Sequence, residues 1–329
     1  MGEVPEAVCL GESMAVLLPD RPGSLAAVES FRAAVGGAES NTACALAALG
    51  IPTAWVSRVG DDGFGRRLLA EVAAHGVDTS AVAVDPERPT GLYLKEGGPH
   101  GPVPRYYREG SAAAALDPGY LAEPAVARLL AGARLLHLSG ITPALSDGCL
   151  ALVRELLARP GRPTVSFDLN WRPALWRRRD PAVLRELLDA ADLVLFGADE
   201  AAAALGTGDP AELRALLPHP ATLVVKDAAH QATAVDRDGR HSTEPALAVT
   251  VVEPTGAGDA FAAGYLAGTL RGLDQHRRLR LGHLAAAAAL TAHGDQGTLP
   301  PADRRAALLD ASPADWAAVR VGPEGWRLP

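Results

Sequence analysis

Short apolar runs, rich in β-branched residues, alternate along most of the chain with longer segments rich in alanine and leucine. The runs that we predict as strands occupy residues 7–10, 53–59, 135–138, 164–168, 193–196, 223–225 and 249–252. Strands that alternate with helices are typical of βαβ units, which build a mainly parallel sheet covered by helices on both faces. The pattern therefore predicts an α/β fold, whose ligands bind beyond the carboxyl ends of the strands.

Two segments interrupt this rhythm, at about residues 13–35 and 90–111. The second contains "TGLYLKE" and "RYYREGS", two strand-like runs separated by a turn of glycine and proline. We expect the two insertions to form a small β-sheet that acts as a lid. Edge strands often pair with another subunit, so the lid is where we expect the contact of a homodimer. Residues from 300 onward are interpreted as a terminal helix and an irregular tail.

At 329 residues and 48% hydrophobic composition, the chain can bury a large core in one large domain or two smaller ones. Its formal net charge of −8 argues against nucleic-acid or membrane-surface binding, because there is no basic excess to neutralise phosphates. Its three cysteines are odd in number and widely spaced, which favours reduced core residues over disulfides or a metal cluster. No signal-peptide pattern and no apolar stretch of ~18 residues is found, so we expect a cytoplasmic protein without a membrane partner.

The run "VTVVEPTGAGDAFAAGYLAG" at residues 249–268 carries the first candidate chemistry. The first turn of a helix leaves backbone N–H groups unpaired and adds a partial positive charge. Gly256, Ala257 and Gly258 leave little side-chain bulk there, so they suit an anion hole for a phosphoryl group, with Asp259 facing the same cavity. An ordinary glycine turn with an acidic helix start explains this run equally well.

Two other phosphate-binding motifs are excluded by the same sequence. A dinucleotide-binding fingerprint needs a third glycine where Phe261 stands, and a Walker A loop needs a Gly-Lys-Ser/Thr tripeptide, which the chain lacks.

Near the amino terminus, "GGAESNTACALAALG" begins with Gly36 and Gly37, which permit close backbone approach to a ligand. Asn41, at the start of the predicted helix, can donate to a ligand hydroxyl. A plain glycine turn before a capped helix is the alternative interpretation.

Two arginine-containing motifs indicate recognition of an anion or a polyol. In "SFDLNWRP", extended backbone would point Asn170 and Arg172 to one face at the carboxyl end of a strand. In "RYYREGSA", the same period of two places Tyr106 and Arg108 on one face and Tyr107 on the other. A tyrosine hydroxyl beside a guanidinium suits a carboxylate or a polyol, although an exposed lid strand also alternates in this way.

Together these motifs resemble the PfkB, or ribokinase-like, family of small-molecule kinases. "GGAESN" and "PTGAGDAFAAGY" stand in the family's order, and the resemblance covers nearly the whole chain. It implies a ribokinase-like sandwich, a single kinase domain over residues 1–329, and the use of ATP and Mg²⁺. By this resemblance Asp259 is the catalytic base, and Gly256, Ala257 and Gly258 form the anion hole.

The resemblance also implies a role for the stretch "LFGADE". Glu200 matches the acid of the family's Asn-x-x-Glu motif, which helps to hold Mg²⁺ through water. Gly197 stands in place of that motif's asparagine.

Within the family, "GLYLKE", "YYREGSAAAAL", "LHLSGITPALS" and "DLNWRPALW" are most similar to 2-keto-3-deoxygluconate kinases. This likeness implies that the sugar acid contacts Gly36, Gly37, Asn41, Tyr93, Tyr106, Arg108, Arg172, Asp259 and Asp295. It places Asn170, Gly197, Lys226, Thr255 and His283 on the ATP side.

Three departures from the family pattern fall on the ATP side. The chain reads "KDAAHQA" after Lys226 where such kinases often carry Lys-x-Gly-x-x-Gly, Glu253 replaces a more usual aspartate, and His283 replaces a common asparagine. A neutral-sugar kinase of the fructokinase or ribokinase type, and a catalytically weak sugar-acid or nucleotide sensor, therefore stand as alternatives. Arg108 and Arg172 argue against a neutral sugar, because a substrate without a carboxylate would leave these charged donors poorly used. Retention of Asp259 and of the small-residue loop argues against a sensor.

Overall fold

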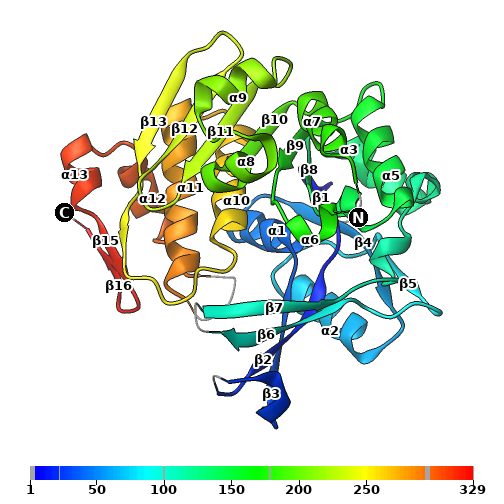
Figure 1. Cartoon of the computed structure of the whole chain (residues 1–329). Helices are drawn as coiled ribbons and strands as arrows, with labels where there is room; N and C mark the ends of the chain where they lie inside the picture. The colour runs from blue at the N-terminus through cyan, green and yellow to red at the C-terminus, as the bar shows by residue number, and fades with distance from the viewer. Residues whose placement is uncertain (1–3, 22, 99–100, 178, 293–296, 329) are drawn as a thin grey trace.

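A nine-stranded sheet runs through the centre of the molecule (Figure 1). The computed structural model describes residues 4–21, 23–98, 101–177, 179–292 and 297–328. In spatial order the strands are β13 (His241–Pro245), β12 (Gln231–Asp236), β11 (Thr222–Asp227), β10 (Leu193–Gly197), β9 (Thr164–Asp168), β8 (Leu135–Ser139), β1 (Ala7–Leu10), β4 (Thr53–Gly60) and β5 (Val82–Asp85). From β11 to β5 the neighbours pair in parallel, whereas β12 and β13 run antiparallel at one edge. The mainly parallel sheet confirms the predicted α/β fold.

The central strands are apolar because both of their faces are covered. Every residue of β1 and β8 is buried, and so are the four apolar residues that begin β10. A strand buried on both faces gives a continuous apolar run, which is why these strands could be read from the sequence. The edge strand β13 alternates buried and exposed positions with few apolar residues, and it was not predicted.

Helices cover both faces of the sheet and enclose two separate hydrophobic clusters. One face carries α1 (Ala38–Ala48), α2 (Gly63–Ala74), α10 (Ala257–Leu270), α11 (Gln275–Leu290), α12 (Ala302–Leu309) and α13 (Pro313–Ala318). The other carries α3 (Pro124–Gly132), α4 (Thr142–Leu145), α5 (Asp147–Ala158), α6 (Pro173–Trp176), α7 (Pro181–Ala190), α8 (Ala198–Leu205) and α9 (Pro210–Leu216). Helix α10 is buried from Ala260 onward over most of its length, and it packs against α11 and α1.

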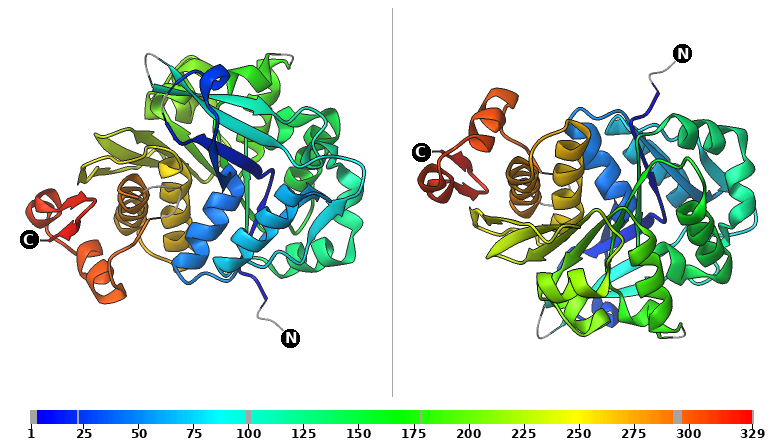
Figure 2. Two further views of the ribbon diagram at one scale, coloured as in Figure 1. Left: turned by 90° about the horizontal axis from the view of Figure 1, so that it is seen from below. Right: turned by 90° about the horizontal axis from the view of Figure 1, so that it is seen from above.

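A second sheet, here called the lid sheet, is separate from the central one. Its spatial order is β3 (Phe31–Gly36), β2 (Met14–Pro19), β6 (Leu92–Gly98) and β7 (Gly101–Tyr107). It lies below the central sheet in Figure 1 and is seen from below in the left panel of Figure 2. The small separate sheet therefore arises from the two segments that broke the α/β rhythm.

Two sequence predictions are corrected by the structure. Residues 249–252 are not a strand of the central sheet, because only β14 (Ala248–Val249) forms, and it pairs with β15 (Arg320–Gly322). The amide of Thr250 donates to the Val321 carbonyl of β15, and the amides of Val252 and Glu253 donate to the Leu290 carbonyl at the end of α11. The carboxyl-terminal segment is also more ordered than an irregular tail, since α12 and α13 precede a hairpin of β15 with β16 (Gly325–Arg327). In the described part of the chain, every helix is too short or too polar to cross a membrane.

Candidate active site

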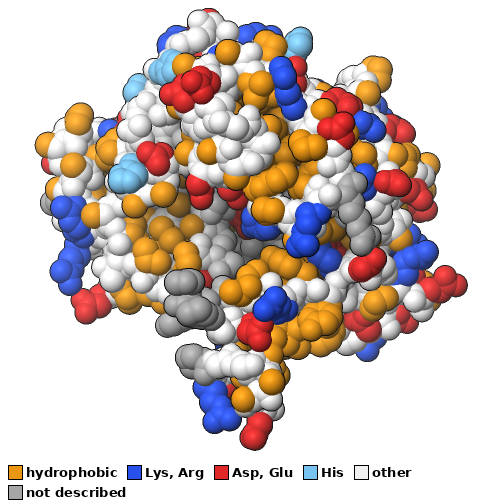
Figure 3. Space-filling model, in the orientation of Figure 1, with side chains coloured by type: hydrophobic (Ala, Val, Ile, Leu, Met, Phe, Trp, Pro, Cys, Tyr) orange, Lys and Arg blue, Asp and Glu red, His pale blue; other side chains and the backbone are white. Residues whose placement is uncertain are grey.

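The carboxyl ends of the parallel strands, the first turns of α1 and α10, and the lid sheet meet at one place. Figure 3 shows the surface hollowed between the body and the lid sheet, with acidic and basic side chains around the hollow. Asn41, Asn170, Lys226 and Asp259 are far apart in the sequence and are brought together here. This is the position at which ligands of a parallel sheet bind.

The predicted anion-hole loop forms the start of α10. Gly256 has φ of 80° and precedes the first helical residue, so a residue with a side chain would be strained there. Gly256 offers no capping side chain, and Ala260 is the residue whose amide bonds back to the Gly256 carbonyl, at 2.9 Å. The amides of residues 257–259 thus precede the regular helical bonding and lie at the positive end of the helix dipole.

Asp259 is held by amide side chains at both of its carboxylate oxygens. The Nδ2 of Asn41, in the first turn of α1, donates to Oδ2 at 2.9 Å, and the Nδ2 of Asn170 donates to Oδ1 at 3.3 Å. The prediction that Asn170 and Arg172 share a face of an extended strand is wrong. Strand β9 ends at Asp168 and Asn170 has φ of 41°, because the chain must turn there to begin α6, and asparagine tolerates that conformation.

Lys226, near the end of β11, brings a positive charge close to the predicted anion-hole loop. Its Nζ donates to Oδ2 of Asp168 at 2.9 Å and lies 3.6 Å from the position that a Cβ on Gly258 would occupy. Burial alone would lower the pKa of Lys226, but the Asp168 and Glu200 carboxylates outweigh it, so the pKa is raised and the ammonium stays charged. The sequence motifs did not single out Asp168, although its place as the last residue of β9 could have found it.

Glu200 lies in the first turn of α8, close to the charged side chains of Asp168 and Lys226. Burial raises the pKa of its carboxyl, the nearby Asp168 carboxylate adds to this, and Lys226 and Arg172 oppose it. The amide of Gly197, the residue just before α8, donates to Glu200 Oε2 at 3.3 Å, so the Glu200 side chain reaches back to the start of its own helix. Nη1 of Arg172 lies 3.4 Å from Glu200 Oε1, and its side chain is 40% exposed.

Arg108 is buried and already has a carboxylate partner within the chain. Its Nε donates to Glu12 Oε2 at 2.6 Å, its Nη2 contacts the same oxygen, and Ser111 Oγ donates to the other oxygen at 2.6 Å. Glu12 therefore balances part of the charge of Arg108 within the chain. Glu12 lies two residues after the end of β1 and was not recognised from the sequence. The guanidinium has five N–H donors, so some remain for a ligand.

The two predicted tyrosines pair across the lid sheet. Tyr93 on β6 stands opposite Tyr106 on β7, with ring centroids 5.5 Å apart, and the Arg108 guanidinium lies 5.5 Å from the Tyr106 ring centroid. Tyr93 is buried, whereas Tyr106 is 39% exposed. This agrees with the predicted common face of Tyr106 and Arg108.

The glycine pair before α1 has a structural use. A Cβ on Gly37 would lie 2.5 Å from the Glu12 carbonyl oxygen, so the absent side chain lets the chain pass close to residues 12 and 13. Gly36 ends β3 and leads directly into this contact.

Of the remaining predicted residues, Thr255 lies on the loop before Gly256, and its hydroxyl donates to Glu253 Oε1 at 2.6 Å. His283 is packed inside the protein, with its ring against Phe261 and Trp316 and its Nε2 3.0 Å from the Glu244 carbonyl oxygen. These are contacts of a core side chain, and burial lowers its pKa to about 4. Asp295 lies outside the described residues.

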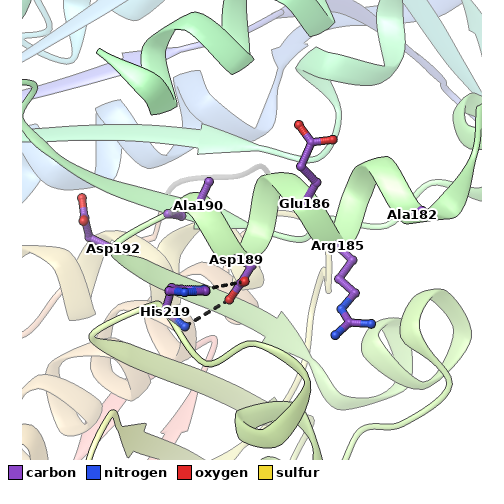
Figure 4. A pocket seen from close by; sticks show the side chains of 8 residues that line it. Ala182, Arg185, Glu186, Asp189, Ala190, Asp192 and His219 are labelled. Carbon is purple, nitrogen blue, oxygen red and sulfur yellow. Dashed lines mark hydrogen bonds and ion pairs between the residues drawn. The ribbon is translucent and has the colours of Figure 1, made fainter. Parts of the chain in front are cut away.

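A second hollow of about 650 Å³ lies elsewhere, along α7. Figure 4 shows that His219 and Asp189 face each other there, with His219 Nδ1 2.7 Å from Asp189 Oδ2. The hollow borders Asp192, which precedes β10, so it lies at the amino ends of the strands. Ligands of parallel sheets bind at the opposite ends of the strands, so this hollow is the weaker candidate.

The pfkB family carbohydrate kinase model matches residues 4–302. The chain belongs to this family. The matched range includes both lid segments and the predicted anion-hole loop, so the described residues of the site lie within it.

Relatives within the pfkB family are similar over nearly their whole length. The chain is 36% identical to a 2-dehydro-3-deoxygluconokinase of Thermoproteus tenax, covering 92% of this chain and 94% of that protein. It is 34% identical to a 2-dehydro-3-deoxygluconokinase of Bacillus subtilis, covering 93% and 96%. A solved structure of a PfkB protein from Polaromonas sp. JS666 is 33% identical, with a TM-score of 0.78 and coverage of 93% and 100%.

Proposed function

We propose that this pfkB-family protein, acting as a single domain over residues 1–329, transfers the γ-phosphoryl group of ATP to a primary hydroxyl of a 2-keto-3-deoxy sugar acid. The acceptor class is that of 2-keto-3-deoxygluconate, the 2-dehydro-3-deoxygluconate of the relatives' names. The observation that carries the proposal is the carboxylate of Asp259, held by Asn41 and Asn170 at the edge of the anion hole. A base beside an anion hole is the arrangement that phosphoryl transfer to a hydroxyl requires.

The proposed step needs one proton transfer and one displacement. The acceptor hydroxyl oxygen forms a bond to the γ-phosphorus, the bond from that phosphorus to the bridging oxygen of ADP breaks, and the hydroxyl proton passes to Asp259. In this step the amides of residues 257–259, at the start of α10, and the nearby Lys226 ammonium would stabilise charge on the transferring group. Most of the rate enhancement then comes from positioning and electrostatics.

The carboxylates at the site fit Mg²⁺ carried by a nucleotide. Oδ1 of Asp168 is buried and lacks a hydrogen-bond partner among the described residues, and Glu200 lies close enough to influence the same charges. The described residues hold no cluster of three His, Cys, Asp or Glu that could bind a metal by themselves. This suits Mg²⁺, which is typically bound through one or two carboxylates together with phosphates and water. Bound Mg²⁺ would neutralise phosphate charge.

An ADP-release assay with purified protein and a panel of acceptors tests this function. The panel contains 2-keto-3-deoxygluconate, 2-keto-3-deoxygalactonate, 5-keto-2-deoxygluconate, fructose, ribose and adenosine. We expect the highest kcat/KM with a 2-keto-3-deoxy sugar acid. ADP release with none of the six acceptors contradicts the proposal.

A neutral-sugar kinase is the second candidate, and one observation favours it. Arg108 is paired with Glu12 and Arg172 lies near Glu200, so both positive charges are partly balanced within the chain. A higher kcat/KM with fructose than with every sugar acid in the panel would favour the neutral-sugar kinase.

A homodimer through the lid sheet is a further part of the proposal. Strand β7 is an edge of that sheet, and Val103 and Tyr107 on it are exposed. An unpaired edge with exposed apolar side chains suits pairing with a second copy. Light scattering of the wild type and of Tyr107→Lys tests it, with a dimer expected only for the wild type.

A further inference from the structure

Lys95 reaches from the lid sheet to the loop that carries the anion hole. It lies on β6, and its Nζ donates to Thr255 Oγ1 at 2.9 Å and lies 3.4 Å from Glu253 Oε2. The two partners are separated from Lys95 by about 160 positions in the sequence. The Lys95 side chain is only 17% exposed, so the contact is largely shielded from water and salt.

On the loop side, Thr255 makes two hydrogen bonds to Glu253, and it directly precedes Gly256 of the proposed anion hole. Glu253 Oε1 accepts from both the hydroxyl of Thr255, at 2.6 Å, and its amide, at 3.2 Å. Burial raises the pKa of Glu253, but the bonds from Thr255 and the charge of Lys95 outweigh this, so its pKa is lowered. The carboxylate therefore stays charged and holds Thr255 directly before Gly256.

On the lid side, Lys95 shares a strand with a predicted sugar-binding residue. Tyr93 and Lys95 are two positions apart on β6, so their side chains leave the same face of the strand. Tyr93 stands opposite Tyr106, and Lys95 stands opposite Pro104. One face of one lid strand thus presents an aromatic residue toward the acceptor side and an ammonium toward the anion-hole loop.

We propose that Lys95 is a positioning residue that couples the lid sheet to the anion-hole loop through Glu253 and Thr255. When the lid sheet lies over the acceptor, Lys95 fixes the loop so that the amides of residues 257–259 are aligned for the γ-phosphoryl group. This inference rests on the proposed function for the identity of the acceptor and of the anion. The contact itself does not depend on either.

Steady-state kinetics of Lys95→Met test the coupling, because methionine keeps the apolar stem and removes the charge. We expect kcat to fall roughly 10-fold to 100-fold, while the KM for the sugar stays within about 3-fold, because a misaligned anion hole affects the transition state more than the bound sugar. Lys95→Arg should restore most of kcat. Arg105→Met is the matched control, since it also removes a positive charge from the same hairpin, where Arg105 pairs with Glu96 at 2.7 Å.

Hydrogen–deuterium exchange of the ligand-free proteins gives a readout that needs no substrate. We expect faster exchange of the amides at residues 253–259 in Lys95→Met than in the wild type, and no change there in Arg105→Met. A double-mutant cycle with Glu253→Gln should show losses in kcat that are far from additive. Unchanged exchange in Lys95→Met, additive losses, or equal effects of the two methionine variants overturn the coupling. A wild type that phosphorylates no sugar acid overturns the proposed function instead, and the exchange comparison still decides the role of Lys95.

Discussion

Asn41 and Asp259 stand 218 residues apart, and a hydrogen bond of 2.9 Å joins them, from Nδ2 of the asparagine to Oδ2 of the aspartate. Each residue lies in the first turn of its helix, so the bond ties the start of α1 to the start of α10. Asn170 holds the other oxygen of the carboxylate. The two amides, which come from different parts of the chain, fix the orientation of the Asp259 carboxylate.

The first prediction concerns this carboxylate. Asp259→Asn should lower kcat by roughly 100-fold or more, because general-base catalysis typically contributes ~10²–10⁴. Sugar affinity, measured by calorimetry, should stay within a few-fold, because the amide keeps the size of the side chain. Turnover close to that of the wild type would show that another group takes the proton.

Much of this site could be predicted because its residues follow strand ends and helix starts. Asp259 and the small residues before it are recognisable from the helix that follows, and the family resemblance places them in a kinase. Lys226 is the last but one residue of an apolar strand. A residue in such a position lies at the ligand-binding edge whatever the rest of the chain does.

The partners that balance charge could not be predicted, because they depend on how distant segments meet. Glu12 and Arg108 are 96 residues apart and come together only when both lid segments are in place. Asp168 pairs with Lys226 across the sheet, 58 residues away. The turn at Asn170 was misread for a related reason, since the pattern of apolar residues does not show where a strand gives way to a left-handed residue.

The second prediction separates two roles of Arg108, in stability and in substrate recognition. Arg108→Met should lower the free energy of unfolding by about 3–5 kcal/mol, because it leaves the buried Glu12 carboxylate without its charged partner. The double variant Glu12→Gln/Arg108→Met should recover most of that loss, since replacing both partners of a buried ion pair is often nearly neutral. Urea denaturation of the three proteins measures this.

The double variant then tests recognition of the carboxylate. Its kcat/KM for 2-keto-3-deoxygluconate should fall about 10-fold to 100-fold, because a charge-assisted hydrogen bond contributes about 1.5–3 kcal/mol. Its kcat/KM for fructose should change little. Equal slowing of both substrates would mean that Arg108 acts through the local structure around Glu12 and does not bind a substrate carboxylate.

The third prediction is a loss of stability in mild acid that depends on His283. Burial lowers its pKa to about 4 in the folded protein, with the Glu244 carbonyl and carboxylate acting in the opposite direction. The unfolded chain binds a proton near pH 6.5 and the folded chain does not, so stability is complete above pH 6.5 and is lost as the pH falls toward 4. Protonation of His283 alone should lower the free energy of unfolding by about 2 kcal/mol at pH 5, relative to neutral pH.

His283→Asn should therefore lose less stability than the wild type between pH 7 and pH 5, as measured by urea denaturation at both values. His75→Asn is the control, because His75 is exposed after α2. The carboxylates are common to all three proteins, so the comparison isolates the histidine. Identical pH dependence in wild type and His283→Asn would contradict a neutral, buried His283.

The last prediction concerns Ala228, which stands where related kinases carry the first glycine after the lysine. Ala228 has φ of 42° in the turn between β11 and β12, a conformation that costs an L-residue roughly 1–2 kcal/mol. Ala228→Gly should therefore raise the free energy of unfolding by about 0.5–1 kcal/mol, after the greater freedom of glycine in the unfolded chain is subtracted. Because Lys226 lies two residues before the turn, ATP affinity should change more than sugar affinity. Ala229→Gly, at the next exposed position, should destabilise the protein slightly, and a gain of stability there equal to that of Ala228→Gly would show that the left-handed backbone is not the cause.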